Sequence, residues 1–349
     1  MNSIVSVLQT SPDSIRSDYI KLMTDAGIDS FLDSAISTAV IAEVGLNSFY
    51  PAATPPPWML EGVIYALESK GNRAGQIDLL VRSLTGFLNR GNVVRHFGQL
   101  NAKYNISNRR GNSVEPIEAA KDKNVIVLGT LRTHVASTIC GALTNAALVL
   151  RPSGQFRPVL VSLEEICERF RQLKSMASGV FGVLDGTFAG DGSGPRCLRL
   201  FTKNFILASS DLVALDAVAA KMMGYDPMSI PYLRRAQEEN LGCADLSRIE
   251  ICGADITTVD FRFHVTAEES SPLFGNLVRR LRLSENKHTW RYGLLIFLIE
   301  QMQDLYVRKF WFEKVGKKRR ALAAQSLWGN LLKDYGLNFS EFSFGVTAK

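Results

Sequence analysis

Short apolar runs alternate with helical stretches over residues 36–255, and this alternation constrains the fold more than any other feature of the chain. The runs are rich in Val and Ile, which is typical of strands that are covered on both faces of a sheet. The strand candidates are residues 39–44, 77–81, 125–128, 180–184, 205–208 and 249–252. Because helical patterns separate these runs, we expect an α/β fold with an open, mostly parallel, doubly wound sheet.

The length of 349 residues suits one large domain with an appendage. We predict three parts: an N-terminal segment (1–35), an α/β domain (36–258) and a helical, basic C-terminal extension (259–349). Apolar residues make up 46% of the chain, which is enough to build a full-sized core in the α/β domain.

The C-terminal extension carries most of the positive charge. Residues 276–320 contain twelve Lys or Arg and four Asp or Glu, an excess of +8 that leaves the rest of the chain near −2 within the net charge of +6. This asymmetry predicts an anionic partner for the extension. Its helices either pack on the α/β domain or form a basic amphipathic element on an acidic lipid surface or a protein partner. No nucleic-acid partner is expected, because aromatic platforms do not interleave the basic residues.

The cysteines and the first residues indicate the compartment. Five cysteines are an odd number, and none has C-x-x-C spacing. We therefore expect reduced thiols, and no disulfide framework, zinc site or cysteine-ligated iron–sulfur cluster within this chain. The start lacks a basic region before an apolar stretch, so no targeting segment is predicted. The expected location is cytoplasmic, with peripheral membrane association through the extension as an option.

One segment combines a strand end, an acid and glycines at alternate positions. We predict that the strand ends at Asp185 and that Gly190, Gly192 and Gly194 form a loop whose N–H groups hold an anionic ligand, with Arg196 as a further contact. The spacing does not fit the dinucleotide-binding fingerprint, and no Gly-Lys-Ser/Thr of a Walker loop occurs. A purely structural glycine-rich turn is the alternative.

A second group of polar residues lies at the predicted helix 212–223. Ser210 and Asp211 precede this helix, where capping alone could explain them. Asp216 lies inside it among apolar residues, and a buried carboxylate must be paired, protonated or metal-bound. We expect Asp216 to serve the functional site, with a structural hydrogen-bonded role as the alternative.

A third group follows the predicted strand 125–128. Arg132 and His134 come soon after this strand, and Asn145 lies in the helical stretch beyond them. Of the four histidines, His134 is the one placed at a strand end, which makes it the best candidate for a general acid or base or a metal ligand. A structural histidine is the alternative.

These three groups, in this order, resemble the family known as domain of unknown function 362, some of whose members are described as iron–sulfur-centre proteins. The resemblance covers roughly residues 36–255 and is most specific over 184–196 and 206–224. It implies site roles for the following residues: His134, Asn145, Asp185, Gly190, Gly192, Gly194, Pro195, Ser210, Asp211 and Asp216.

The chain departs from the family pattern at several positions. Arg132, Glu43 and Thr144 replace lysines of the family, and Gly45 replaces an asparagine. The ferredoxin-like cysteine module of some relatives is absent from this sequence. The family has no generally assigned chemistry, so the resemblance informs the fold and the site more than the reaction.

The leading hypothesis is an enzyme that binds a small anionic substrate at the glycine-rich segment. In this hypothesis His134, Asp185 and Asp216 converge on one cleft at the carboxyl edge of the sheet, as acid/base groups or as ligands of a divalent metal such as iron. The iron–sulfur association of the relatives favours oxidoreductase-like chemistry. The alternative is a non-catalytic protein that binds a cofactor or a phosphate ligand in the same cleft.

Overall fold

The computed structural model describes residues 3–44, 49–71, 76–83, 97, 99–100, 103–104, 107–109, 117–150, 162–194, 196–266, 302 and 305–337. The strands are β1 (Ser3–Gln9), β2 (Thr38–Val44), β3 (Ile77–Ser83), β4 (Ser107–Arg109), β5 (Asn124–His134), β6 (Thr138–Ile139), β7 (Gly179–Ser193), β8 (Cys197–Thr202), β9 (Phe205–Ser209) and β10 (Ile249–Gly253). The helices are α1 (Ile15–Asp25), α2 (Pro57–Ser69), α4 (Ala142–Val149), α5 (Leu163–Met176), α6 (Leu212–Met223), α7 (Pro231–Glu238), a π-helix (Val307–Gly316), α10 (Lys317–Ala324) and α11 (Leu327–Asp334).

The strands form one sheet in the order β10-β1-β9-β7-β5-β2-β3-β4, with β6 paired to β5 and β8 paired to β7. Along this order β9 is antiparallel to both of its neighbours, and the remaining pairs are parallel. The predicted α/β fold with a mostly parallel sheet is therefore confirmed. The first 35 residues supply β1, which lies between β10 and β9, together with α1.

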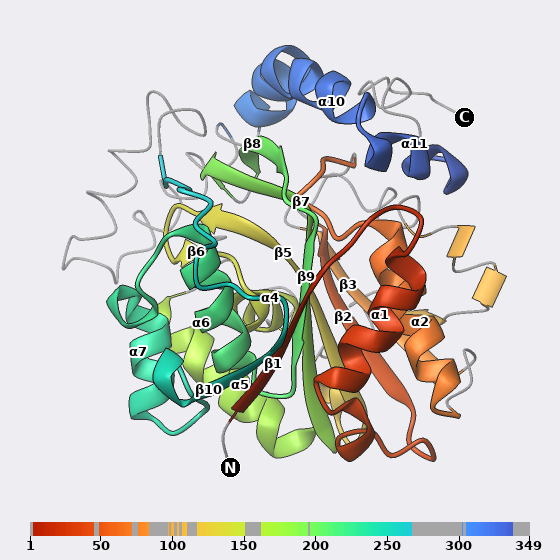
Figure 1. The fold of residues 1–349 in the computed structure, drawn as a ribbon, viewed down its shortest axis with the longest axis vertical. Coiled ribbons are helices and arrows are strands. Elements are labelled where there is room, and N and C mark those ends of the chain that lie inside the picture. The colour runs from red at the N-terminus through yellow and green to blue at the C-terminus, as the bar shows by residue number, and fades with distance from the viewer. Residues whose placement is uncertain are drawn as a thin grey trace.

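Helices cover both faces of this sheet, which is the doubly wound arrangement that the sequence predicts. One core contains Tyr19 and Trp58 from α1 and α2, and the other contains Leu143, Phe170 and Leu215 from α4, α5 and α6. Figure 1 shows α1 and α2 on one side of the strands and α4, α6 and α7 on the other. Every residue of β5 is buried, because this central strand is covered on both faces.

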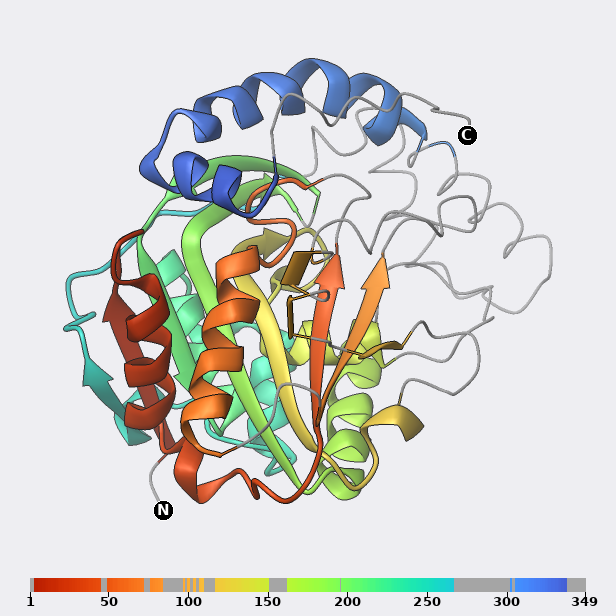
Figure 2. The same cartoon turned by 90° about the vertical axis from the view of Figure 1, so that its right-hand side faces the viewer.

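The direction of winding reverses between β2 and β5. Strand β2 leads through α2 to β3 on one side, and β5 leads through α4 and α5 to β7 on the other. In open α/β sheets, ligands bind beyond the carboxyl ends of the strands at such a reversal. Figure 2 shows the two orange strands, β2 and β3, with their arrowheads directed toward the edge over which the blue C-terminal helices lie.

The prediction that a loop begins at Asp185 is wrong. Strand β7 continues to Ser193, because residues 188–193 pair in register with β8 after residues 182–185 have paired with β9. Within this long strand Gly190 allows close packing, because a Cβ atom there would lie 3.0 Å from Leu198 and 3.2 Å from Ala52. Immediately after the strand, a Cβ atom at Gly194 would collide with the carbonyl oxygen of Thr133, so the close approach of β5 to this turn requires glycine there.

The C-terminal extension is helical, as predicted, and its helices pack on the α/β domain. The indole of Trp328 lies 5.2 Å from that of Trp58, and its N–H donates to Asn204 Oδ1 at 2.7 Å. The hydroxyl of Tyr335 donates to buried Glu61 of α2 at 2.5 Å.

Most of the predicted basic region, residues 276–301, lies outside the described residues. Within the part that the structure covers, no helix is long and apolar enough to cross a membrane.

Candidate functional site

A buried polar cluster lies where β2 and β5 diverge, at the carboxyl edge of the sheet. Its centre is the guanidinium of Arg132, which donates from Nη2 to Glu43 Oε2 of β2 at 2.8 Å. The same nitrogen lies 3.2 Å from Cys140 Sγ and 3.4 Å from Asn145 Oδ1 of α4. All four side chains are buried. The cluster therefore joins two neighbouring strands to the helix that follows one of them.

Arg132 also holds the segment that follows β2. Its Nη1 donates to the carbonyl oxygens of Ala53 at 2.5 Å and Ala52 at 3.4 Å. The hydroxyl of Thr130 donates to the same Ala52 oxygen at 2.5 Å. Ala52 has φ 63°, a left-handed conformation that costs an L-residue about 1 kcal/mol. The hydrogen bonds from β5 stabilise this strained backbone at the edge of the sheet.

The cluster is electrostatically balanced. Burial disfavours the charged guanidinium, but the neighbouring Cys140 and Glu43 outweigh this effect, so the pKa of Arg132 is raised above its ordinary value. Burial raises the pKa of the Cys140 thiol to about 11, although Arg132 lowers it. Cys140 is therefore a neutral thiol at pH 7, which is a weak nucleophile. The cluster consists of a buried ion pair, a thiol and an amide.

His134 lies at the end of β5, two residues beyond Arg132. Its Nδ1 accepts hydrogen bonds from the N–H groups of Ala136 at 3.2 Å and Ser137 at 3.1 Å, and lies 2.9 Å from Ser137 Oγ. Two N–H donors at Nδ1 leave the proton of the neutral ring on Nε2. In this tautomer Nε2 is a hydrogen-bond donor and offers no lone pair to a metal.

The β7–β8 hairpin reaches the same edge of the sheet. Arg132 pairs with Gly190, Thr133 Oγ1 donates to the Gly192 carbonyl at 3.2 Å, and the N–H of Val135 donates to the Gly194 carbonyl at 3.2 Å. Arg196 is partly buried in the turn that follows. The structure therefore brings these predicted site residues to one edge: Arg132, His134, Asn145, Gly190, Gly192, Gly194 and Arg196.

Asp185 faces the α1 and α2 side of the sheet. Its Oδ2 accepts hydrogen bonds from Tyr19 Oη at 2.6 Å and Trp58 Nε1 at 3.2 Å. Its Oδ1 accepts from the N–H of Thr187 at 2.8 Å and from its hydroxyl at 2.5 Å. Burial raises the pKa of Asp185, although these donors lower it. The contacts of Asp185 are those of a structural acceptor that ties α1 and α2 to β7.

Asp216 lies on the opposite side of the sheet and caps α4. Its Oδ1 accepts from the N–H of Ala142 at 2.5 Å, and its Oδ2 accepts from the N–H of Leu143 and from Tyr232 Oη, both at 3.1 Å. A Cβ atom at Gly141 would collide with this carboxylate. The groups that hydrogen-bond to Asp216 are therefore the first turn of α4 and Tyr232. A site role would instead involve a cation, Arg196 or the glycine-rich segment.

Ser210 and Asp211 precede α6, as predicted, and Asp211 is its N-cap. The carboxylate of Asp211 accepts from the N–H groups of Val213 at 2.9 Å and Ala214 at 3.1 Å. It also accepts from Ser3 Oγ of β1 at 2.6 Å and from the N–H of Cys243 at 2.9 Å. These contacts join the start of α6 to β1, so capping explains Asp211.

His134, Asp185 and Asp216 therefore do not form one site in this structure. Asp185 and Asp216 point to opposite faces of the sheet, and both are engaged by donors that a metal would displace. The tautomer of His134 also opposes ligation. Among the residues that the structure describes, no three His, Cys, Asp or Glu side chains are grouped to hold a metal ion.

Two members of the buried cluster, Glu43 and Cys140, were not predicted as site residues. Glu43 appears in the sequence only as a departure from the family pattern, yet it is an acid at the end of an apolar strand. A buried acid in such a run must have a partner, and this is the signal that could have identified it. Its partner, Arg132, is 89 residues away in the chain, so local sequence does not reveal the pair.

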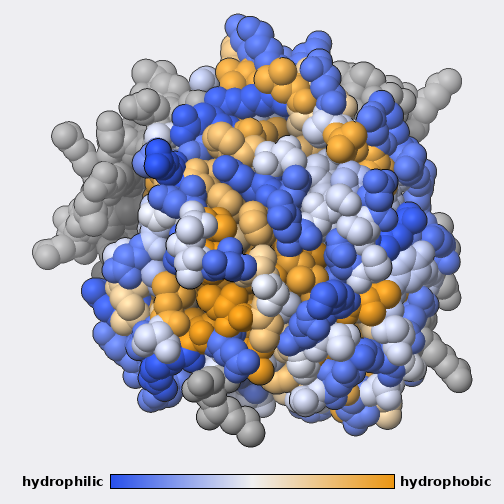
Figure 3. Space-filling view, in the orientation of Figure 1, coloured by the Kyte–Doolittle hydropathy of each residue, from blue (hydrophilic) through white to orange (hydrophobic). Residues whose placement is uncertain are grey.

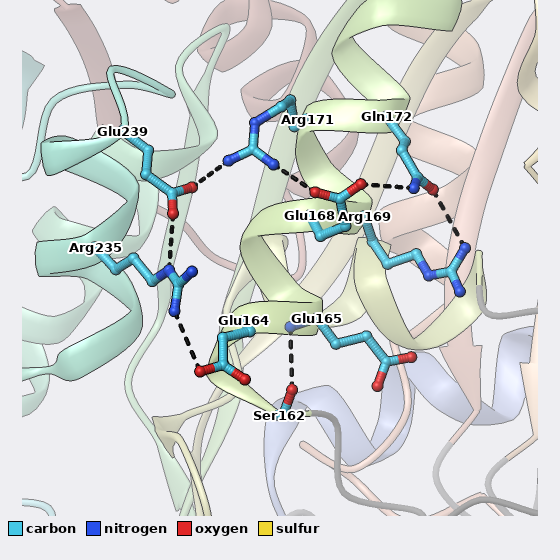
Figure 4. A pocket seen from close by; sticks show the side chains of 9 residues that line it. All are labelled: Ser162, Glu164, Glu165, Glu168, Arg169, Arg171, Gln172, Arg235 and Glu239. Carbon is cyan, nitrogen blue, oxygen red and sulfur yellow. Dashed lines mark hydrogen bonds and ion pairs between the residues drawn. The ribbon is translucent and has the colours of Figure 1, made fainter.

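A shallow depression of about 420 Å³ lies on the surface of α5 and α7 (Figure 4). Its walls are charged side chains that pair with one another. Arg171 joins Glu168 to Glu239, and Arg235 joins Glu239 to Glu164. Exposed pairs of this kind contribute little to stability or to ligand specificity, so we do not assign a ligand to the depression.

Residues 96–221 match the family model described as domain of unknown function (DUF362). This confirms the resemblance over that stretch, which is shorter than the range drawn from the sequence. It contains β5, α4 and the β7–β8 hairpin, with Arg132, His134, Asn145 and Arg196, but it does not reach Glu43. The comparisons with curated proteins and with solved structures found no match.

Replacing Asp216 with Asn should change how stability depends on pH. Burial raises the pKa of Asp216 to about 7, although Ala142, Leu143 and Tyr232 lower it. The native state therefore holds this proton more tightly than the unfolded chain does. The contribution of Asp216 to the unfolding free energy should fall as pH rises from about 4 to about 7, by roughly 4 kcal/mol in total.

Asn does not titrate, so the difference in unfolding free energy between wild type and Asp216→Asn should shrink over the same pH range. Urea denaturation between pH 4.5 and pH 8 would measure this difference. Tyr232→Phe removes a donor that lowers the pKa of Asp216 and should move the transition to higher pH. A difference between wild type and Asp216→Asn that is constant with pH would contradict the raised pKa.

Proposed function

We propose that this protein is an enzyme that binds a small anionic substrate over the carboxyl end of β5. The observation that carries the proposal is the junction of the end of β5 with the β7–β8 turn, which brings His134 and Arg196 to the edge where Arg132 lies. This edge lies at the reversal of winding between β2 and β5, where open α/β sheets bind their ligands.

Two guanidinium groups lie at this edge. Arg132 is balanced by Glu43, and Arg196 brings a second guanidinium to the turn beside them. The carboxylates of Asp185 and Asp216 are not part of this edge, because they accept hydrogen bonds from Tyr19 and from the first turn of α4. Guanidinium groups bind carboxylate and phosphate oxygens through paired N–H donors. A substrate with a phosphate or carboxylate group would suit this edge.

The backbone at this edge is strained on two sides. Ala52 has φ 63° and Thr138, which pairs with His134, has φ 69°. A positive φ is especially unfavourable for a β-branched residue such as threonine. Strain of this kind is concentrated at functional sites, where the surrounding hydrogen bonds maintain it. Its presence beside both Arg132 and His134 supports a functional role for this edge.

His134 would act as a proton donor in the proposed reaction. Its Nδ1 is fixed as an acceptor by backbone N–H groups, so the neutral ring carries its proton on Nε2. A donor fixed in this way can protonate a leaving group or stabilise negative charge that develops on an oxygen. The proposal assigns no metal to His134, Asp185 and Asp216, because their contacts do not suit ligation.

The second candidate function is non-catalytic binding of a phosphate-type ligand at the same edge. It is favoured by the state of the acidic groups: Cys140 is a neutral thiol, and Glu43 is held in a buried ion pair. A neutral thiol and a carboxylate held in an ion pair are not ready nucleophiles or bases. Turnover by the wild-type protein distinguishes the two functions.

Arg196→Gln should weaken the binding of anions. Losing a charge-assisted hydrogen bond costs about 1.5–3 kcal/mol, so we expect the Kd for inorganic phosphate to rise by about 10- to 100-fold in calorimetric titration. Arg234→Gln is the matched control, because Arg234 is an exposed arginine of α7. Equal phosphate affinity in the two variants would contradict the assignment of Arg196.

His134→Gln should separate catalysis from binding. Wild type and variant would be incubated with a mixture of phosphorylated and carboxylated metabolites, and consumption would be followed by mass spectrometry. Loss of a general acid slows a reaction by about 10²- to 10⁴-fold, whereas Gln retains a donor for ligand binding. We expect turnover to fall while phosphate affinity stays within about threefold. Equal turnover in both proteins would contradict this role of His134.

A further inference from the structure

The helical segment from Val307 to Ala324 has two distinct faces. Its inner face packs on the α/β domain: the rings of Trp311 and Phe312 lie 5.4 Å and 6.3 Å from that of Tyr50. Arg319 also contributes to this attachment, because its Nη1 donates to the carbonyl oxygen of Leu198 in β8 at 3.1 Å. Arg319 therefore attaches the extension to the domain, while the guanidinium of Arg320 stacks over Phe312 at 4.0 Å within the extension.

The outer face carries large apolar side chains in contact with water. They are between 38% and 72% exposed, and they comprise Met302, Leu305, Phe310, Val315, Leu322 and Leu327. Only two other large apolar side chains, Phe201 and Val265, are exposed to a comparable degree in the rest of the described structure. Six of the eight exposed large apolar side chains of the described residues therefore belong to these C-terminal helices. Figure 3 shows orange groups mixed with blue ones at the top of the molecule, and a further orange area at the lower left.

Three exposed lysines lie among these apolar side chains. They are Lys314, Lys317 and Lys318, and the single acid between residues 306 and 327, Glu313, is partly buried. Successive turns of the helix present Phe310, then Lys314 with Val315, then Lys318, then Leu322 toward water. Cations and apolar groups therefore alternate along the helix. In a typical protein–protein interface, by contrast, the apolar groups form a core and the charged groups a rim.

We propose that this outer face, which carries Phe310, Lys314, Val315, Lys318 and Leu322, docks on the surface of a membrane that contains anionic lipids. The apolar side chains would enter the interface between headgroups and acyl chains, and the lysine ammonium groups would contact lipid phosphates. The helix would lie in the plane of the membrane, because no described helix can span it. Trp311 and Arg319 keep the helix attached to the domain while the outer face is occupied.

Other occupants suit this face less well. A second copy that docked through the same face would set three lysines against three lysines, which like-charge repulsion opposes. Interfaces between proteins are depleted of lysine at their centres, whereas here the lysines lie between the largest apolar groups. An anionic lipid surface offers acyl chains to the apolar side chains and phosphates to the lysines of the same helix.

The test uses the full chain and vesicles of phosphatidylcholine with or without phosphatidylserine, followed by co-sedimentation. We expect binding to need phosphatidylserine and to weaken as salt rises from about 50 to about 500 mM. Each lysine near an anionic membrane strengthens binding by roughly fivefold, so replacing Lys314, Lys317 and Lys318 with Gln should weaken it about 100-fold. Phe310→Ser with Leu322→Ser should also reduce binding, at every salt concentration.

The matched control replaces Lys121, Arg234 and Arg248 with Gln, which removes the same charge from exposed positions of the α/β domain. This control should bind vesicles like wild type. All variants change exposed side chains, so their melting temperatures should match wild type, and their phosphate affinity should be unchanged. Binding without phosphatidylserine, an equal loss in the control, or an altered oligomeric state in place of altered vesicle binding would overturn the proposal.

Discussion

The carboxyl edge of this protein depends on one buried guanidinium. Arg132 is the last-but-two residue of β5, and it contacts β2 through Glu43, α4 through Asn145, and the segment after β2 through the Ala52 and Ala53 carbonyls. Burying a charge costs several kcal/mol unless a counter-ion and further acceptors compensate. Here a carboxylate, an amide and two carbonyls do so, and the result fixes the relative position of two strands, a loop and a helix where the winding of the sheet reverses.

The same contacts extend to the C-terminal helices. The segment held by Arg132 also carries Tyr50, whose hydroxyl donates to the Leu198 carbonyl at 2.7 Å and whose ring contacts Trp311. Arg319 donates to that same Leu198 oxygen. The proposed substrate site and the proposed membrane surface therefore share one connected framework at one end of the molecule (Figure 1). Asp185 and Asp216 support this framework from either face of the sheet, the first through α1 and α2 and the second through the start of α4.

The sequence predicts the framework better than the site. Alternating strand and helix patterns are local, and they identify β2, β3, β5, β7, β9 and β10. The antiparallel direction of β9 is not a local property, and β1 was missed because its partners, Ala208 and Ile251 among them, are distant in the chain.

Glycines at alternate positions suit a ligand loop and a closely packed strand equally well, so the continuation of β7 could not be recognised. Nor could the sequence show that Asp185 and Asp216 face opposite sides, because that depends on which helices cover each face. The sequence hypothesis expected His134, Asp185 and Asp216 to converge at the strand ends. Of these three, His134 alone lies at the edge that carries Arg132 and the β7–β8 turn.

A double-mutant cycle on the pair Arg132 and Glu43 tests most directly whether this ion pair organises the edge. Arg132→Met and Glu43→Leu would be made singly and together, and the unfolding free energy of each would be measured by urea denaturation. Each single variant leaves a buried charge without its partner, so we expect a loss of about 3–5 kcal/mol in each. The double variant should lose less than the sum of the single losses, by about 2 kcal/mol or more. Losses that add to within about 0.5 kcal/mol would contradict the central role of the pair.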